Sequence, residues 1–448
     1  MASERRAVLL GLSAAAAFAA AAAAAQAPEF DQGVKVRPVL EAARTSAGMS
    51  ASPGGVEKIP PVADEGAVWI SVGADALAHP AEVSLPMGVP VLANGRAAVF
   101  KVSADRLPEI SGYMHEHFKR CGGFFAHDSR AEAEADLASS AASGGGDYTL
   151  DQQAVVTPLM GRVKEAELRQ TIEALAAFNN RYYQADTGMQ AAQWVAGRWQ
   201  NVSKGLPGAS VALVNHANWK QPSVVLTIPG SERPDEIVVL GGHLDSINGW
   251  GSSSARAPGA DDNASGIAVL TETVRVLASS GWRPKRTVKV MGYAAEEVGL
   301  RGSNDIARQH QGAKVVGVIQ YDMTNFKGSG DGIFFLSDHT DQSLTAFEGK
   351  LVDAYVGVPW ALTECGYACS DHASWEKVGK PASAAFESTF DGMNHALHTE
   401  NDTLGTSGGS AEHSVAFAKL GVAFAVELAK TASGATLAGT APKADAGR

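Results

Sequence analysis

Positive charge, cysteine and long apolar segments are all scarce in this chain of 448 residues. Lys and Arg total 37 against 48 Asp and Glu, so the formal net charge is −11, and no basic run exceeds a short pair. A protein that binds a phosphate backbone needs a basic face, so we expect no nucleic-acid partner. Beyond the N-terminus, no segment reaches the ~20 apolar residues of a transmembrane helix.

The N-terminus predicts export. Arg5 and Arg6 precede the alanine-rich run Ala7–Ala25, which is short for a membrane span, and a small-residue cleavage site follows at Ala25–Ala27. We expect a signal peptide over residues 1–27, a secreted protein that is extracellular or periplasmic, and no membrane contact after signal removal. An uncleaved membrane anchor is the alternative.

The three cysteines are Cys121, Cys365 and Cys369. Export permits a disulfide, and the odd count means that one cysteine is left over or is removed.

The next part of the chain divides at a small-residue segment. Residues 65–132 predict a small unit with strands at Ala67–Val72 and Ala97–Val102 and a helix at Ala104–Arg120. Ala131–Gly146 ends in Ala-Ala-Ser-Gly-Gly-Gly, which is typical of a flexible linker that proteases cut. We therefore place a domain boundary at residue 147.

From Tyr148 onward, short apolar runs alternate with helical apolar spacing. The predicted strands are Ser223–Ile228, Ile237–Leu240, Val288–Met291 and Val315–Gln320, and the predicted helices are Val163–Asn179, Met189–Val202, Ser265–Ser279, Ser343–Val356 and Val415–Thr431. This alternation predicts an α/β fold, with a mixed, mostly parallel β-sheet flanked by helices on both faces. The tail at 433–448 is rich in small residues and is expected to be disordered.

Metal-binding side chains follow the predicted strands. His243 and Asp245 follow the second strand, Glu296 and Glu297 the third, and Asp322 the fourth. Asp261 and Asp262 precede a helix, and His398 lies in a later loop. In a parallel sheet, ligands bind beyond the carboxyl ends of the strands.

Taken singly, each of these pieces has an ordinary explanation. A histidine after a strand is usually structural, a Glu-Glu pair is usually solvated, and an Asp-Asp pair before a helix usually caps it. Together they would form a cluster of carboxylates that is costly to desolvate unless cations neutralise it. Imidazole and carboxylate are ligands that zinc accepts, so we predict a metal site here.

Six motifs carry a family resemblance. They are GGHLDS (241–246), APGADDNASG (257–266), YAAEEVGLRGS (293–303), QYDMTN (320–325), CGYACSDHASW (365–375) and HTENDT (398–403). In this order they resemble the zinc leucyl aminopeptidases secreted by bacteria, and the similarity covers about residues 148–432. The resemblance implies a zinc exopeptidase fold for 148–432, preceded by a small α+β pro-region at 28–147.

The resemblance also implies roles for the residues. Two Zn²⁺ ions per chain would be bridged by Asp261, with Glu297 and His398 completing one site and His243 and Asp322 the other. Glu296 would be the catalytic general acid/base, and Asp245 would orient His243. The peptide bond between Asp261 and Asp262 is expected to be cis in this family. The implied activity is hydrolysis of the N-terminal peptide bond by a metal-bridging water.

A side-chain pocket is implied by the same resemblance. It would be lined by Met323, Leu336, Tyr367, Phe386, Phe390, Met393 and Leu397, which favours leucine and other large apolar residues. Taken singly, each of these residues could equally belong to the hydrophobic core. A Cys365–Cys369 disulfide would hold the Tyr367 loop at the pocket rim, whereas a dithiolate metal site is the alternative.

Two other readings compete with an aminopeptidase. One is another zinc hydrolase on the same fold, a carboxypeptidase or a glutaminyl cyclase, and the other is a non-catalytic relative that kept the fold. The expected partners are peptides with a free N-terminus and a protease that removes the pro-region, which would act as folding aid and inhibitor. We expect a monomer.

Overall fold

The computed structural model describes residues 66–73, 76, 87–95, 97–118, 122–138, 146, 148–249 and 254–435. The predicted signal peptide, Cys121 and most of the predicted tail therefore lie outside the described residues. Among the residues described, no helix is long and apolar enough to cross a membrane.

The N-terminal unit, residues 66–138, is a small antiparallel sheet with two helices. Its strands are β1 (Ala67–Gly73), β2 (Leu92–Ala93), β3 (Ala97–Ser103) and β4 (Phe125–His127), in the order β2-β3-β1-β4. The 3-10 turn η2 (Ala104–Arg106) leads into α2 (Leu107–Phe118), and α3 (Arg130–Ala138) follows β4. The prediction of a flexible linker over 131–146 is thus wrong for its first half, because that part forms α3, which packs on β1 and buries Ala133.

The main unit, residues 148–435, is built on an eight-stranded sheet. Its strands are β5 (Ser210–Val214), β6 (Ser223–Ile228), β7 (Arg233–His243), β8 (Arg286–Tyr293), β9 (Lys314–Tyr321), β10 (Ile333–Leu336), β11 (Trp360–Thr363) and β12 (Ala382–Phe386). Their order is β11-β10-β12-β9-β7-β8-β6-β5. The four central strands β12, β9, β7 and β8 are mutually parallel, whereas β10 joins β12 and β6 joins β8 antiparallel. The predicted mixed sheet is confirmed, with parallel pairs among the four central strands and between β10 and β11 at one edge, and antiparallel pairs elsewhere.

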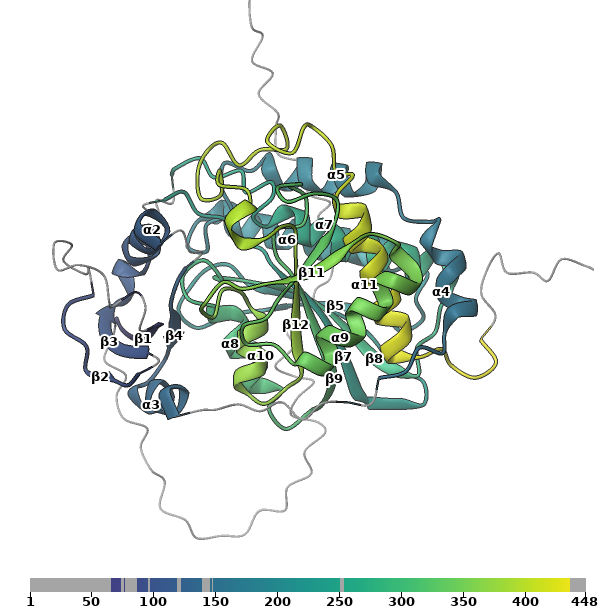
Figure 1. Ribbon diagram of the computed structural model, residues 1–448, viewed down its shortest axis with the longest axis horizontal. Coiled ribbons are helices and arrows are strands. Elements are labelled where there is room, and N and C mark those ends of the chain that lie inside the picture. Colours follow the sequence, from purple (N-terminus) through teal and green to yellow (C-terminus); the bar gives the residue numbers. More distant parts are fainter. Residues whose placement is uncertain are drawn as a thin grey trace, which may run out of the picture.

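Helices cover both faces of this sheet (Figure 1). They are α4 (Gln153–Met160), α5 (Glu165–Ala176), α6 (Asp186–Val202), α7 (Ala264–Ser280), α8 (Arg301–Gln309), α9 (Gln342–Leu351) with η3 (Val352–Val356), α10 (His372–Lys377), the short turn η4 (Phe390–Gly392) and α11 (Ser414–Ala429). Side chains alternate across the pleat of β7. Val238 and Leu240 join the apolar core under α6, α7 and α11, and Val239 joins the core under α8 and α10.

The two units share one apolar core. The N-terminal cluster around Ile70, Phe100 and Met114 also contains Tyr182 and Val298 of the main unit. Figure 1 shows the N-terminal unit at one end of the molecule, with β4 nearest to α8.

Candidate metal centre

Polar side chains gather where three central strands end. β7 ends at His243, β8 ends at Tyr293 shortly before Glu296, and β9 ends at Tyr321 just before Asp322. Because these strands are parallel and adjacent, their carboxyl ends meet at one edge. The sequence prediction that these strand ends converge is confirmed.

His243 lies within reach of several carboxylates. Its Nε2 is 3.0 Å from Oδ1 of Asp262, 3.3 Å from Oδ1 of Asp322 and 4.0 Å from Oε2 of Glu296. All four side chains are buried. One imidazole and two carboxylates thus face a common point, as the ligands of a single cation would.

A second set of donors lies beside the first. Nε2 of His398 is 2.5 Å from Oε2 of Glu297 and 3.2 Å from Oδ2 of Asp262. Asp262 therefore presents one oxygen to His243 and the other to His398. Among the residues described, His243, Asp262 and Glu297 also form the group whose donor atoms lie close enough to hold a metal.

The prediction that Asp261 is the shared carboxylate is wrong, because Asp262 occupies that place. Oδ1 of Asp261 accepts the Asn325 backbone N–H at 3.0 Å, and its Oδ2 accepts Asn394 Nδ2 at 3.2 Å. Asp261 is thus turned away from both histidines and toward neighbouring loops. The cis peptide bond correspondingly lies between Asp262 and Asn263, one residue after the predicted position.

Asp245 connects the two loops that carry the cluster. Its Oδ1 lies 3.5 Å from Nδ1 of His243. Its two carboxylate oxygens accept the backbone N–H groups of Glu296 and Glu297, at 3.0 and 3.2 Å. Asp245 therefore lies beside His243, which the resemblance expects it to orient, and it hydrogen-bonds to the backbone of the two glutamates.

The electrostatics of the cluster call for cations. Burial, reinforced by nearby carboxylates, raises the pKa of Glu296 well above its usual value and that of Glu297 to about 7. Burial lowers the pKa of His398, but Glu297 and Asp262 outweigh it and raise that pKa to about 10. Neither carboxylate oxygen of Glu296 has a hydrogen-bond partner among the described residues. Such groups are stable as anions only beside positive charge, so the donor set fits divalent metal ions.

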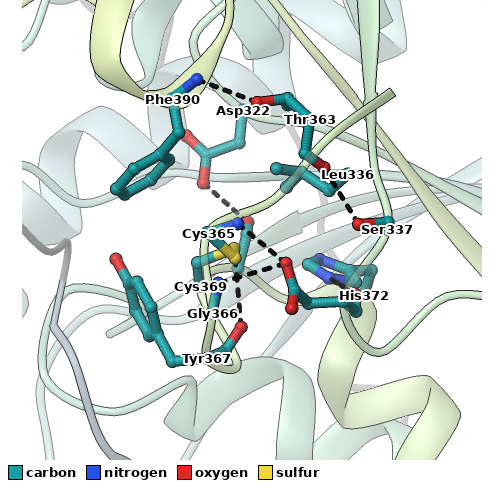
Figure 2. The surroundings of a disulfide bond; sticks show 12 residues. Asp322, Leu336, Ser337, Thr363, Cys365, Gly366, Tyr367, Cys369, His372 and Phe390 are labelled. Carbon is teal, nitrogen blue, oxygen red and sulfur yellow. Dashed lines mark hydrogen bonds between the residues drawn. A yellow bond between two sulfur atoms is a disulfide. The ribbon is translucent and has the colours of Figure 1, made fainter. Parts of the chain in front are cut away.

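The seven predicted pocket residues form one apolar cluster with the two cysteines. Met323, Leu336, Tyr367, Phe386, Met393 and Leu397 are buried in it, and Phe390 packs against it. Met323 follows Asp322 and Leu397 precedes His398, so the cluster adjoins the candidate metal ligands. The rings of Tyr367 and Phe390 meet edge to face at 6.3 Å (Figure 2).

Cys365 and Cys369 form the disulfide that the resemblance implied. The bridge closes the loop that carries Tyr367, and Asp338 accepts the backbone N–H groups of Cys365 and Gly366 at 2.7 and 3.2 Å. Ser370, next in the chain, donates to Oδ2 of Asp322 at 2.6 Å. The loop therefore links the apolar cluster to a metal-binding carboxylate.

Several supporting residues escaped the sequence analysis. Asp402 accepts the backbone N–H groups of Asp261 and Asp262 at 3.2 and 3.0 Å. Asn394 bonds to both Asp261 and Asp402, and Glu387 lies beside Asp261. For Asp402 a signal was available, since it belongs to the same HTENDT motif as His398. Glu387 and Asn394 carry no motif, and only the fold brings them here.

Comparisons with known proteins agree with this geometry. Residues 223–422, which include every member of the cluster, match the model of peptidase family M28. A probable leucine aminopeptidase of Arthroderma otae is 40% identical over 288 residues, which span 62% of this chain and 78% of that protein. The chain belongs to peptidase family M28. It is therefore a hydrolase of the aminopeptidase type in a family of zinc peptidases.

Other M28 relatives extend the comparison. A probable aminopeptidase of Saccharomyces cerevisiae is 34% identical over 57% of this chain and 71% of its own length. Among solved structures, LapB of Legionella pneumophila is 29% identical with a TM-score of 0.71, covering 81% of this chain and all of LapB. The LapA aminopeptidase of that organism is 27% identical with a TM-score of 0.70, covering 81% of this chain and 98% of LapA. Residues 148–432 are less than two thirds of the chain, so the likenesses to the two solved structures, which cover 81% of it, extend beyond them.

Proposed function

We propose that this M28 enzyme is a two-zinc aminopeptidase that removes leucine and other large apolar residues from peptide N-termini. The shared carboxylate of Asp262 carries the proposal. It faces His243 together with Asp322 on one side, and His398 together with Glu297 on the other. Two adjacent sets of three donors with one carboxylate in common are what a pair of bridged ions requires.

Bound zinc would supply Lewis acidity, which lowers the pKa of water and polarises the scissile carbonyl. Glu296, which is buried beside this point and is not needed in either donor set, takes the proton from water and returns it to the leaving amine. Asp245 holds both Glu296 and His243 in place for that transfer. The carboxylates of the cluster also attract a free α-ammonium group, which favours cleavage at the N-terminus of a peptide.

The apolar cluster supplies the proposed specificity. Met323 and Leu397 are chain neighbours of metal-binding residues, so a substrate side chain at the centre lies next to them. Burying a leucine side chain contributes about 1.5–3 kcal/mol, which is roughly a tenfold to hundredfold preference over glycine. The side chains that form the cluster are apolar apart from the Tyr367 hydroxyl, so a charged substrate side chain would find no counter-charge among them.

The alternative functions would require different residues at this site. A carboxypeptidase needs a free cation for the substrate carboxylate, but the buried Arg181 near the cluster donates its N–H groups to main-chain carbonyls. A one-zinc cyclase needs only one of the two donor sets. A non-catalytic relative needs none.

One assay series separates these readings. The purified chain, cut between the two units so that the N-terminal unit can leave, is tested on leucine-p-nitroanilide and on its N-acetylated form, before and after chelation and after titration with zinc. Hydrolysis of the free-amine substrate alone, recovering fully at two zinc ions per chain, is expected. Equal hydrolysis of both substrates, or full activity at one zinc, would contradict the proposal.

For the N-terminal unit we propose a pro-region that covers the centre until it is cut away. The ring of His115 on α2 lies 4.8 Å from the ring of the metal-binding His398. Gly122 is the first described residue after α2, and a Cβ built on it would lie 3.7 Å from the backbone oxygen of Glu297. The N-terminal unit thus contacts the cluster without contributing to either donor set. A permanent accessory domain is the alternative.

Polar contacts fasten this cover to the main unit. Arg308 on α8 donates to Asp128 at 2.7 Å and to Glu132 at 2.5 Å. Lys377 on α10 lies 3.0 Å from Nδ1 of His127, and Ala126 donates its backbone N–H to Gly299 at 3.0 Å. Covalent linkage adds an effective concentration of about millimolar, which cutting the chain near residue 140 would remove.

A test follows activity and release together. The unprocessed chain is treated with a protease that cuts between the units, and hydrolysis is measured alongside size-exclusion profiles. Activity should rise as the N-terminal fragment separates, and Arg308→Gln should separate more readily after cutting. Arg198→Gln is the matched control, because Arg198 pairs with Glu167 inside the main unit. Activity that stays flat while the fragment leaves would rule out a cover.

Export by the N-terminal segment and its removal are part of the same proposal. Mass spectrometry of the mature protein from the culture medium should find an N-terminus after residue 25 or 27, or after the pro-region. A mature protein that retains residue 1 and stays with the membrane fraction would contradict it.

A further inference from the structure

Arg181 is a buried guanidinium directly behind the metal centre. It lies in the connection between α5 and α6, and its side chain is enclosed with 1% of the residue exposed. An isolated charge at such a depth is costly, so its hydrogen-bond partners should account for it.

Those partners are all main-chain carbonyls. Nε donates to Leu244 at 2.8 Å, Nη1 to Pro258 at 2.5 Å and to Leu175 at 3.4 Å, and Nη2 to Gly259 at 2.9 Å and to Asp262 at 3.4 Å. A guanidinium has five N–H donors in a fixed planar fork, so each donor finds an acceptor. No other side chain has this geometry, and lysine has fewer donors.

Four of the five accepting carbonyls belong to the two loops that carry His243 and Asp262, and the fifth, that of Leu175, belongs to α5. Leu244 stands between His243 and Asp245 in the loop after β7. Pro258 and Gly259 lead to Asp262 in the loop before α7. Gly259 leaves room for this contact, since a Cβ built there would lie 2.7 Å from Nη2 of Arg181. One side chain therefore ties the His243 loop to the Asp262 loop.

The charge of Arg181 also suits its surroundings. Burial lowers its pKa to about 10, against the attraction of Asp402, Asp262, Asp245 and Glu297. The group is therefore a cation at neutral pH. It offsets part of the repulsion among carboxylates that must lie close together before any metal binds.

We infer that Arg181 is a positioning residue for the metal centre: it holds the loops of His243 and Asp262 at ligand spacing without touching metal or substrate. The inference rests on the two-zinc proposal and adds a residue to it. Residues that support metal ligands typically change metal affinity about 10–100-fold when replaced.

The experiment compares Arg181→Met and Arg181→Lys with the wild-type chain and with Arg256→Met. Arg256 is a matched control, because it also donates to main-chain carbonyls, those of Phe178 at 2.6 Å and Ala176 at 3.0 Å, but neither belongs to a ligand loop. Zinc affinity is measured by competition with a chelator, and the site geometry by the visible absorption spectrum after loading with Co²⁺. Circular dichroism reports whether each variant folds.

Both Arg181 variants should bind zinc at least about tenfold more weakly and show an altered Co²⁺ spectrum. They should lower kcat for leucine-p-nitroanilide while leaving KM nearly unchanged, because the apolar cluster is untouched. Arg256→Met should match the wild type in all three measurements. If Arg181→Met does not fold, the zinc affinity and the Co²⁺ spectrum of Arg181→Lys test the inference.

Wild-type zinc affinity and spectrum in a folded Arg181 variant would overturn the inference. Equal losses in the Arg181 and Arg256 variants would also overturn it, since the effect would then be general destabilisation. If the wild-type chain itself binds no zinc, the two-zinc proposal fails instead, so the two failures are distinguishable.

Discussion

The candidate metal centre and the interface between the two units both contain several carboxylate side chains, but the groups around those carboxylates differ. At the interface, Asp128 and Glu132 meet Arg308, and Asp136 lies 3.9 Å from Lys377. At the centre, the carboxylates of Asp262, Glu296, Glu297 and Asp322 gather around two imidazoles. The guanidinium of Arg181, which lies nearby, donates to main-chain carbonyls.

This difference separates a docking surface from a binding site. Matched charges at the interface are satisfied by the chain itself, so they favour one arrangement of the two units. In a buried cluster where carboxylates outnumber the basic groups, their mutual repulsion costs free energy until a cation from outside arrives. Replacing a carboxylate at the centre should therefore change metal binding, whereas changing a charge at the interface should alter how firmly the two units dock.

Replacing the shared carboxylate should have the largest effect. Asp262→Asn should lose both metals and with them nearly all turnover, because Asp262 faces both histidines. Asp261→Asn is the neighbouring control and should keep both metals, since Asp261 bonds to Asn325 and Asn394 instead. Metal analysis and activity of the two variants check this prediction. Loss of metal in Asp261→Asn but not in Asp262→Asn would reverse the assignment made from the structure.

Replacing the two adjacent glutamates of the centre should have different effects, loss of turnover for one and loss of metal for the other. Glu296→Ala should keep close to two zinc ions per chain but lose about 10²–10⁴ in kcat, because this carboxylate moves protons and is in neither donor set. Glu297→Ala should instead lose metal, since Glu297 lies 2.5 Å from His398 within one donor set. Zinc content and steady-state kinetics measure both. A Glu296→Ala enzyme with near wild-type kcat would exclude it as the general base.

Much of the centre was predictable because its residues follow buried strands. The runs at 237–240, 288–291 and 315–320 are apolar enough to mark central strands, and the polar residues that come next must share one sheet edge. The same reasoning predicted most helices within a few residues; for example, 265–279 was predicted and α7 is Ala264–Ser280.

The predictions that were wrong or missing concern features that the periodic pattern of apolar residues does not reveal. Asp261 and Asp262 are identical residues in one turn, and only the backbone path decides which of them faces the histidines. The helix α3 is rich in Ala and Glu with a single buried residue, so it shows little apolar pattern and resembled a linker. Arg181 contacts backbone carbonyls from three distant segments, a relation that no local motif records.

Substrate preference tests the apolar cluster beside the centre. We expect kcat/KM for leucine-p-nitroanilide to exceed that for the glycine analogue roughly tenfold to a hundredfold. Glutamate should be a poor substrate, because its charge would lie unpaired among apolar side chains. Equal kcat/KM for leucine and glutamate would show that the cluster does not contact the substrate side chain.

The smallest expected effect concerns acid release of the N-terminal unit, through His127 at the interface. Burial, then the charges of Lys377 and Arg308, lower the pKa of His127 to about 2. The groups around the ring are Ser71, Phe125 and Asp136 from its own unit and Lys377 and Arg308 from the main unit. Burial lowers the pKa of Lys377 only to about 8, so Lys377 stays charged below neutral pH.

The sign follows from proton binding. In the docked form His127 stays neutral. In the released N-terminal unit, Lys377 and Arg308 no longer lie beside the ring, so the pKa of His127 returns toward the ordinary value near 6.5. Docking is therefore fully stable above that value and weakens as pH falls below it. After the chain is cut between the units, the released fraction measured by size exclusion should be several-fold larger at about pH 5 than at about pH 7.5, below a limit of roughly thirtyfold. His127→Gln cannot titrate and should lose this dependence, whereas an equal dependence in that variant would assign the effect to other groups.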